Sequence, residues 1–264
     1  SYVFTFGIYG SFKYGILGPA ISIVICHIIM MAYLSYYLIF KQSILKVKFH
    51  KFSNLIFIDI MKVGGLGLLN SITIALTVGV MTGYIGNFGP NALAGYGIGA
   101  RLELILTPII FGIGAALTAS VSINFGSKQF ARARKIAFTG GIVCFLIIGL
   151  IGLFINLFPQ FLYQNFSSNP DVIKYCLKYI LIVTPFYCLF GFGQAIYFSS
   201  QGTGKMIKPI LVGILRFSCV VLFGYLAVSR NLSIDYVLYS VSIGLIITGV
   251  GMFLCLLGKE WKGL

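Results

Sequence analysis

The feature that most constrains this chain is a series of long apolar stretches that carry almost no charge. Hydrophobic residues make up 59% of its 264 residues, and charged residues only 9%. A typical soluble domain carries about 25% charged residues, which cover its water-facing surface. The composition therefore predicts an all-α, polytopic membrane helical bundle. It excludes a soluble enzyme, a secreted disulfide scaffold and a disordered tail.

Seven stretches are long enough to cross a bilayer as helices, because a hydrocarbon core of about 30 Å needs roughly 20 apolar residues. They are residues 15–40, 63–86, 96–125, 136–158, 179–200, 209–228 and 235–257. The third is long for a single crossing, so we expect a tilt or a bend at Pro108. The fifth contains Pro185, and we expect neighbouring groups or cavity water to satisfy the backbone groups that this proline frees.

Basic residues outnumber acidic residues by 19 to 5, which gives a formal net charge of +14. One set of alternate connectors holds thirteen of them: Lys41, Lys46, Lys48, Lys51, Lys62, Lys128, Arg132, Arg134, Lys135, Lys205, Lys208, Lys259 and Lys262. The other set holds only four, Lys13, Lys174, Lys178 and Arg230. The positive-inside rule places the richer set in the cytoplasm, so the chain is predicted to start outside and to end inside. The charge thus reports topology and does not indicate binding of nucleic acid.

Residue types that carry metal or redox chemistry are sparse. The six cysteines show no CxxC pair and no metal-ligand spacing. Most of them fall inside apolar stretches, where a free Cys behaves as a small hydrophobic residue. We therefore expect no metal site and no cofactor.

The odd number of spans, starting outside, is unusual for a complete chain without a cleavable signal. Residues 1–12 have no initiator Met, no basic region and no small-residue cleavage site, so they are not a signal peptide. We expect that Ser1 begins in the middle of a longer protein. Residues 41–62 form the one long polar connector. Its lysines alternate with apolar residues, which suits a linker lying along the membrane surface.

Three segments resemble one family of transporters. Residues 91–135 read NALAGYGIGARLELILTPIIFGIGAALTASVSINFGSKQFARARK. They resemble the eighth helix and following loop of multidrug and toxic compound extrusion (MATE) transporters. Residues 169–205, NPDVIKYCLKYILIVTPFYCLFGFGQAIYFSSQGTGK, resemble the tenth helix with its Asn-Pro start and Gly-rich exit, and residues 15–22, GILGPAIS, resemble the sixth. The resemblance covers nearly the whole chain, and residues 91–135 are its most specific part.

The resemblance implies two six-helix lobes that face a central cavity. Residues 1–40 then form the end of the first lobe, with its sixth helix. Residues 41–62 form the cytoplasmic interlobe linker, and residues 63–264 form the second six-helix lobe. The rest of the first lobe is missing from this arrangement, and we expect an isolated second lobe to be inactive and poorly stable.

The activity that the resemblance implies is efflux of organic cations or other amphipathic drugs, driven by inward Na⁺ or H⁺. The partners are then a small cationic or amphipathic substrate, the lipid bilayer and the missing lobe. The implied location is a bacterial inner membrane.

Glu103 is the acidic residue that falls inside a predicted span. The others lie at or beyond span ends: Asp59, Asp171, Asp235 and Glu260. A charged side chain in mid-membrane costs about 2.5–3.5 kcal/mol, so Glu103 should have a partner or face water. It could accept a proton or ligate a dehydrated Na⁺, or it could form a structural ion pair. Arg101, two residues away, points to another side of the helix, which leaves Arg216 as the candidate ion-pair partner.

The sequence departs from the family at its best-known coupling positions. Many members place a carboxylate on helix seven, and others use acidic residues on helices one and ten. Residues 64–79, which resemble helix seven, contain no acid, and neither do residues 179–200 of helix ten. Coupling therefore rests either on Glu103 or on the missing lobe.

Four further side chains are candidates for lining a substrate cavity. They are Asn70 on helix seven and Tyr187, Gln194 and Tyr197 on helix ten. They could hydrogen-bond to a flat cation or stack on it. Alternatively, they could bond one helix to another, which contributes about 0.6 kcal/mol per pair in lipid.

Three other interpretations stay open. A lipid-linked oligosaccharide flippase of the same broader superfamily would line its cavity with several arginines to hold a pyrophosphate, whereas only Arg101 and Arg216 lie in spans. An intramembrane enzyme would need clustered catalytic side chains, and one His and one Glu on separate helices are too sparse. A non-transporting assembly subunit is the third.

Overall fold

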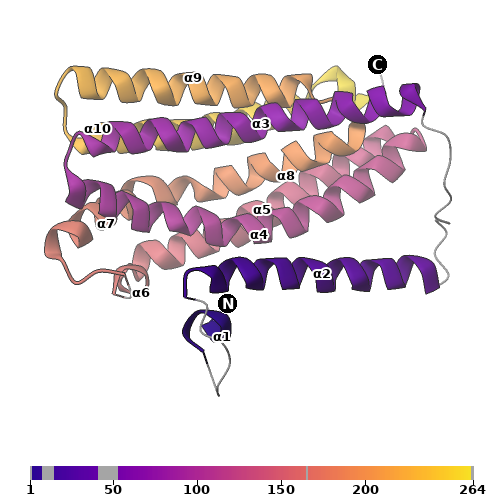
Figure 1. Cartoon of the computed structure of the whole chain (residues 1–264). Coiled ribbons are helices and arrows are strands. Elements are labelled where there is room, and N and C mark those ends of the chain that lie inside the picture. Colours follow the sequence, from indigo (N-terminus) through magenta and orange to yellow (C-terminus); the bar gives the residue numbers. More distant parts are fainter. Residues whose placement is uncertain (1, 8–14, 41–52, 165, 263–264) are drawn as a thin grey trace. The chain divides into compact units, whose positions relative to one another are not determined.

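The structure is a computed structural model that describes residues 2–7, 15–40, 53–164 and 166–262 (Figure 1). The chain forms two compact units, Ser1–Asn54 and Leu55–Leu264. The boundary between the units falls within the segment 41–62 that the sequence predicts as a linker.

The first unit contains α1 (Tyr2–Phe6) and α2 (Leu17–Phe40). The two helices meet at Gly18, where an added Cβ atom would lie 2.6 Å from the backbone of Phe4. Ser22 donates a hydrogen bond of 2.9 Å to the Gly18 carbonyl. The 24 residues of α2 extend about 36 Å, which is enough to cross a bilayer core.

The second unit is built from helices joined by short turns. In chain order they are α3 (Asn54–Gly86), α4 (Pro90–Gly126), α5 (Phe130–Leu157), α6 (Gln160–Tyr163), α7 (Pro170–Val183), the 3₁₀ turn η1 (Thr184–Phe186), α8 (Tyr187–Thr203), α9 (Ile207–Ser229), α10 (Ile234–Leu256) and the 3₁₀ turn η2 (Lys259–Lys262).

Seven helical segments in the described part of the chain are long and apolar enough to cross a membrane. They are α2, residues 64–86 of α3, α4, α5, the joined residues 170–203 of α7 and α8, α9, and α10. The seven predicted spans and the all-α fold are therefore confirmed, and the chain is an integral membrane protein.

The structure adds detail to two local expectations. The segment 41–62 was expected to run as a linker along the membrane surface, but α3 already begins at Asn54. Residues 54–62 contain no Gly or Pro that would stop a helix, so the helix that holds the span 64–86 begins ahead of that span. Residues 41–52 lie outside the described residues. At Pro108, α4 continues as one helix of 37 residues, and the tilt or bend expected there stays a prediction.

The broken helix formed by α7 and α8 is the most deeply buried span of the second unit. In Figure 1 it runs between α4 and α5 on one side and α9 and α10 on the other. Glycines on α8 allow this close approach. An added Cβ atom at Gly191 would lie 2.9 Å from Ile148 of α5, and one at Gly193 would lie 2.7 Å from Thr248 of α10. Small residues at such contacts are what packing between membrane helices requires.

The packing at Gly193 predicts a measurable loss of stability. In Gly193→Ala the new methyl group meets the Thr248 side chain at 2.7 Å and its carbonyl oxygen at 2.9 Å. We expect destabilisation by about 1–3 kcal/mol, as for other overpacked sites. The matched control is Gly112→Ala on α4, because a Cβ atom there meets nothing within 4 Å.

Thermal unfolding in detergent can be followed with a thiol-reactive dye, because Cys144 and Cys176 are buried in the folded chain. Gly193→Ala should unfold at a lower temperature than the native chain, and Gly112→Ala should not. Equal unfolding temperatures for the two variants would contradict the assigned packing.

Candidate functional site

A carboxylate lies inside the membrane-spanning part of the second unit. Glu103 is on α4, 13 residues after the helix begins at Pro90, which is about 20 Å along the helix axis. Its Oε1 atom accepts a hydrogen bond of 2.9 Å from the Tyr179 hydroxyl of α7. The other two acidic side chains that the structure describes, Asp171 and Asp235, lie in the first turns of α7 and α10. Of the three acidic side chains that the structure describes, Glu103 is therefore the one that lies deep within a span.

Two tyrosines form a short chain of hydroxyl groups that ends on Glu103. The Tyr179 and Tyr187 hydroxyls lie 3.2 Å apart, and both side chains are buried. A phenol has one hydrogen to donate. Because Tyr179 donates its hydrogen to Glu103, Tyr187 must donate to Tyr179. The ring of Tyr96, two helical turns before Glu103 on α4, packs edge-on against Tyr179 with centroids 5.7 Å apart.

The two tyrosines flank the break between α7 and α8. Asn169 caps the start of α7 by accepting a hydrogen bond of 3.0 Å from the Asp171 backbone N–H. After Val183, the 3₁₀ turn η1 carries Pro185 and changes the path of the helix. Tyr179 therefore comes from the first half of this span, and Tyr187 from the first residue of the second half.

Neighbouring helices donate hydrogen bonds to backbone carbonyls at this break. Asn156 of α5 donates a hydrogen bond of 3.3 Å to the Ile180 carbonyl. Ser242 of α10 donates one of 2.8 Å to the Ile182 carbonyl. These contacts tie α5 and α10 to carbonyls on either side of Leu181, whose own carbonyl Pro185 frees, and the compensation of that group stays a prediction.

A buried cation lies near the carboxylate. Arg216 of α9 is 7% exposed, and its Nε and Nη2 atoms have no hydrogen-bond partner among the described residues. Its aliphatic part passes Gly244 of α10, where an added Cβ atom would lie 3.4 Å from Arg216 Cγ. Arg216 and Glu103 are close enough for their charges to interact. Among the described residues, the side chains that form an ion pair are Lys178 and Asp235, at 2.8 Å. Arg216 and Glu103 therefore do not form a direct ion pair.

Arg101 faces away from this group, as its spacing of two residues from Glu103 predicts. It is exposed, and its guanidinium carbon lies 5.0 Å above the ring of Phe166.

The remaining candidates lie on α3 and α8. Tyr197 is buried, and its hydroxyl lies close to the side chains of Asn70 on α3 and Gln201 on α8. Asn70 is buried as well, and an added Cβ atom at Gly67 would lie 3.9 Å from both Tyr197 Oη and Gln201 Nε2. Gln194 is buried on α8, three residues before Tyr197. The predicted residues thus separate into a group around Glu103 and a group around Asn70.

Sequence reasoning missed three members of these groups, Tyr96, Tyr179 and Gln201. Tyr96 had a signal, because residues seven apart share a face of a helix and Tyr96 precedes Glu103 by seven. Gln201 had a weaker one, four residues after Tyr197. Tyr179 had none, because its contact with Glu103 depends on how α7 packs against α4.

The group around Glu103 offers one carboxylate oxygen pair, two phenol oxygens and one guanidinium group. Such hard oxygen ligands suit a proton or an alkali cation. Among the described residues there is no cluster of three or more His, Cys, Asp or Glu side chains that could hold a metal ion.

These features define a polytopic integral membrane protein with opposite charges between its spans, Arg216 buried and Glu103 partly buried. The sequence model of the MatE family matches residues 61–226, which is more than half of the chain. The chain belongs to the MatE family.

Individual relatives agree with this assignment. The chain is 22% identical over 217 residues to "Probable multidrug resistance protein YoeA" of Bacillus subtilis, covering 80% of this chain and 47% of that protein. It is 24% identical over 215 residues to "Probable multidrug resistance protein NorM" of Thermotoga maritima, covering 80% of this chain and 46% of that protein. The chain therefore spans about half the length of these curated relatives.

The fold has a close counterpart among solved structures. A MOP superfamily transporter from Pyrococcus furiosus superposes with a TM-score of 0.88 at 19% sequence identity. The match covers 98% of this chain and 58% of the transporter. At this identity the likeness establishes the shared fold.

The proximity of Glu103 and Arg216 predicts that their contributions to stability are coupled. Glu103→Gln or Arg216→Gln alone leaves one buried charge without its counterpart, so each should destabilise the chain. The double variant removes both charges and should lose less than the sum, with a coupling of about 0.5–3 kcal/mol. The measurement is thermal unfolding of the four proteins in detergent. Additive losses would mean that the two charges do not interact.

Proposed function

We propose that the protein containing this chain is a secondary active transporter that exports organic cations or other amphipathic drugs. Inward movement of Na⁺ or H⁺ drives the export, and Glu103 holds the coupling ion. Membership of the MatE family supports a transporter rather than an enzyme. The names of the curated relatives, "Probable multidrug resistance protein" in both cases, support the substrate class. They do not favour the flippase alternative.

The observation that carries the proposal is the hydrogen-bonded carboxylate within α4. In a region of low dielectric, one carboxylate balances one positive charge at a time. A coupling ion and a cationic substrate therefore compete for Glu103. Binding of the ion from one side displaces the substrate, and binding of the substrate from the other side displaces the ion. Alternating access of the site then converts this competition into exchange.

The tyrosines adapt the site to both states. With Glu103 charged, Tyr179 donates its hydrogen to Oε1 at 2.9 Å. When Na⁺ occupies the carboxylate, the same hydroxyl can rotate and present its oxygen to the ion, with its hydrogen turned toward Tyr187 at 3.2 Å. When a proton occupies it, the carboxyl hydrogen can be donated to the Tyr179 oxygen instead.

The organisation of the whole transporter belongs to the same proposal. Residues 1–40 are the end of a first lobe, residues 41–62 a cytoplasmic linker, and residues 63–264 the second lobe. The N-terminus of the chain then lies outside and its C-terminus in the cytoplasm, with the bundle in a bacterial plasma membrane. Support comes from loop charge and from α2, whose apolar side chains are nearly all exposed within its own unit.

The test is efflux of a cationic dye such as ethidium from energised cells. The chain is expressed from its own gene together with any sequence that adjoins these 264 residues. Glu103→Gln keeps the shape of the side chain but removes its charge, so efflux should fall at least tenfold. Asp171→Asn is the matched control, because it makes the same change at the exposed first turn of α7.

Immunoblots of the membranes establish that both variants are present in equal amounts. Normal efflux by Glu103→Gln at normal abundance would remove Glu103 from the mechanism. It would leave the first lobe as the site of coupling.

A further inference from the structure

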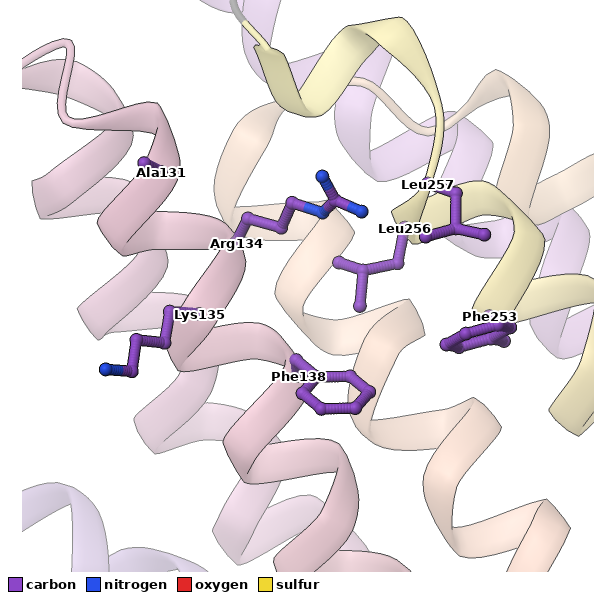
Figure 2. A pocket seen from close by; sticks show the side chains of 7 residues that line it. All are labelled: Ala131, Arg134, Lys135, Phe138, Phe253, Leu256 and Leu257. Atoms are coloured by element: carbon purple, nitrogen blue, oxygen red, sulfur yellow. The ribbon is translucent and has the colours of Figure 1, made fainter.

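A groove runs along the surface of the second unit between α5 and α10. One end is lined by Arg134, Lys135, Phe138, Phe253, Leu256 and Leu257, with a volume of about 350 Å³ (Figure 2). The groove continues past Phe138 and Phe253, which also line a second hollow of about 510 Å³. Because the two hollows share these two rings, they form one continuous feature, here called the α5–α10 groove.

The two ends of the α5–α10 groove differ in polarity. Figure 2 shows the Arg134 guanidinium reaching from α5 toward Leu256 and Leu257, while Lys135 extends to the other side of α5. Neither cation forms an ion pair or donates a hydrogen bond to a described residue. The second hollow is lined only by apolar residues, among them Ile142, Leu146 and Val250. One end is therefore cationic, with no counter-charge among the described side chains, and the other end is lined by apolar residues.

Phenylalanine rings form the floor where the two ends meet. Phe138 and Phe253 have centroids 6.4 Å apart, and Phe192 lies 6.4 Å from the first and 6.2 Å from the second. Phe138 and Phe253 remain 40% and 39% exposed, so their ring surfaces are open to an occupant. Such a floor matches a flexible hydrocarbon chain.

The length of the α5–α10 groove matches one leaflet of a bilayer. From Lys135 to Leu146, α5 rises about 16 Å. This is about half of a hydrocarbon core roughly 30 Å thick. The cationic end lies at the start of α5, where Lys128 and Arg132 are also found. Loop charge predicts that this end faces the cytoplasm, where anionic lipid headgroups attract basic residues.

We propose that the α5–α10 groove binds one anionic phospholipid. The phosphate lies against Arg134, and Lys135, on the other side of α5, adds to the positive charge of this end only at longer range. One acyl chain crosses Phe138 and Phe253 and ends near Leu146 and Val250. The charge of the groove selects the anionic headgroup, because no acidic side chain of the described residues lines either hollow. This site is separate from Glu103 and does not depend on the proposed transport cycle.

The test is native mass spectrometry of the chain in a mild detergent, with phosphatidylglycerol or phosphatidylethanolamine of identical acyl chains added. The native chain should retain one phosphatidylglycerol in preference to phosphatidylethanolamine. Arg134→Gln should reduce retained phosphatidylglycerol about fivefold, the factor expected for one basic residue near an anionic headgroup.

The matched control is Arg132→Gln, two residues away on the same helix. Arg132 lines a different hollow beside Leu117 and Thr139 and donates a hydrogen bond of 3.5 Å to Gln129. This variant should retain phosphatidylglycerol like the native chain. Circular dichroism establishes that both variants keep their helical content.

A second pair of variants tests the hydrocarbon end. Val250→Trp should fill the acyl part and reduce retention of both lipids, whereas Leu254→Trp, an exposed position of α10 outside the lining, should not. Equal retention of the two lipids by the native chain would overturn the proposal. So would equal effects of Arg132→Gln and Arg134→Gln, or unchanged retention in Val250→Trp.

Discussion

The structure depends on one constraint, which is that polar groups within a bilayer core must be satisfied by the protein itself. The break between α7 and α8 and the carboxylate of Glu103 both accept hydrogen bonds from neighbouring helices. Asn156 and Ser242 bond to carbonyls at the break, while Tyr179 bonds to the carboxylate. The span formed by α7 and α8 thus contains both the interruption of the helix and Tyr179, the hydrogen-bond partner of Glu103. This explains why α7 and α8 lie at the centre of the second unit.

Arg216 is the exception to this constraint, and the exception is informative. Its Nε and Nη2 atoms are buried without partners among the described residues, although a buried guanidinium gains most from complete hydrogen bonding. The nearby charge of Glu103 offsets part of that loss without direct contact. A cation that enters between them would meet attraction from Glu103 and repulsion from Arg216. Arg216 would therefore weaken binding at Glu103 and keep it reversible, which an exchange mechanism needs.

Sequence reasoning recovered the architecture because the physics of spanning a bilayer is local. Length and apolarity alone located all seven spans. The predicted span 63–86 agrees with the apolar part of α3, residues 64–86, whereas the helix itself begins earlier, at Asn54, since nothing in a sequence marks where a helix leaves the lipid. Glu103 and Arg216 could be singled out because charge is rare within spans. The partner of Glu103 could not, because Tyr179 reaches it through the packing of α7 against α4, and tyrosines are common in this chain. In the sequence, the residues of the α5–α10 groove could be identified only as basic residues near a loop and apolar residues of spans. That they line one groove depends on how α5 packs against α10, which the sequence does not show.

The central claim is that a coupling ion and a cationic substrate exclude each other at Glu103. The most direct measurement is binding of ethidium to the purified protein, with released H⁺ recorded in weakly buffered detergent solution and released Na⁺ recorded by a sodium electrode. The account predicts that each bound ethidium displaces one coupling cation from the native protein. It predicts no displacement from the Glu103→Gln variant. Ethidium binding to the native protein with no release of either ion would contradict it.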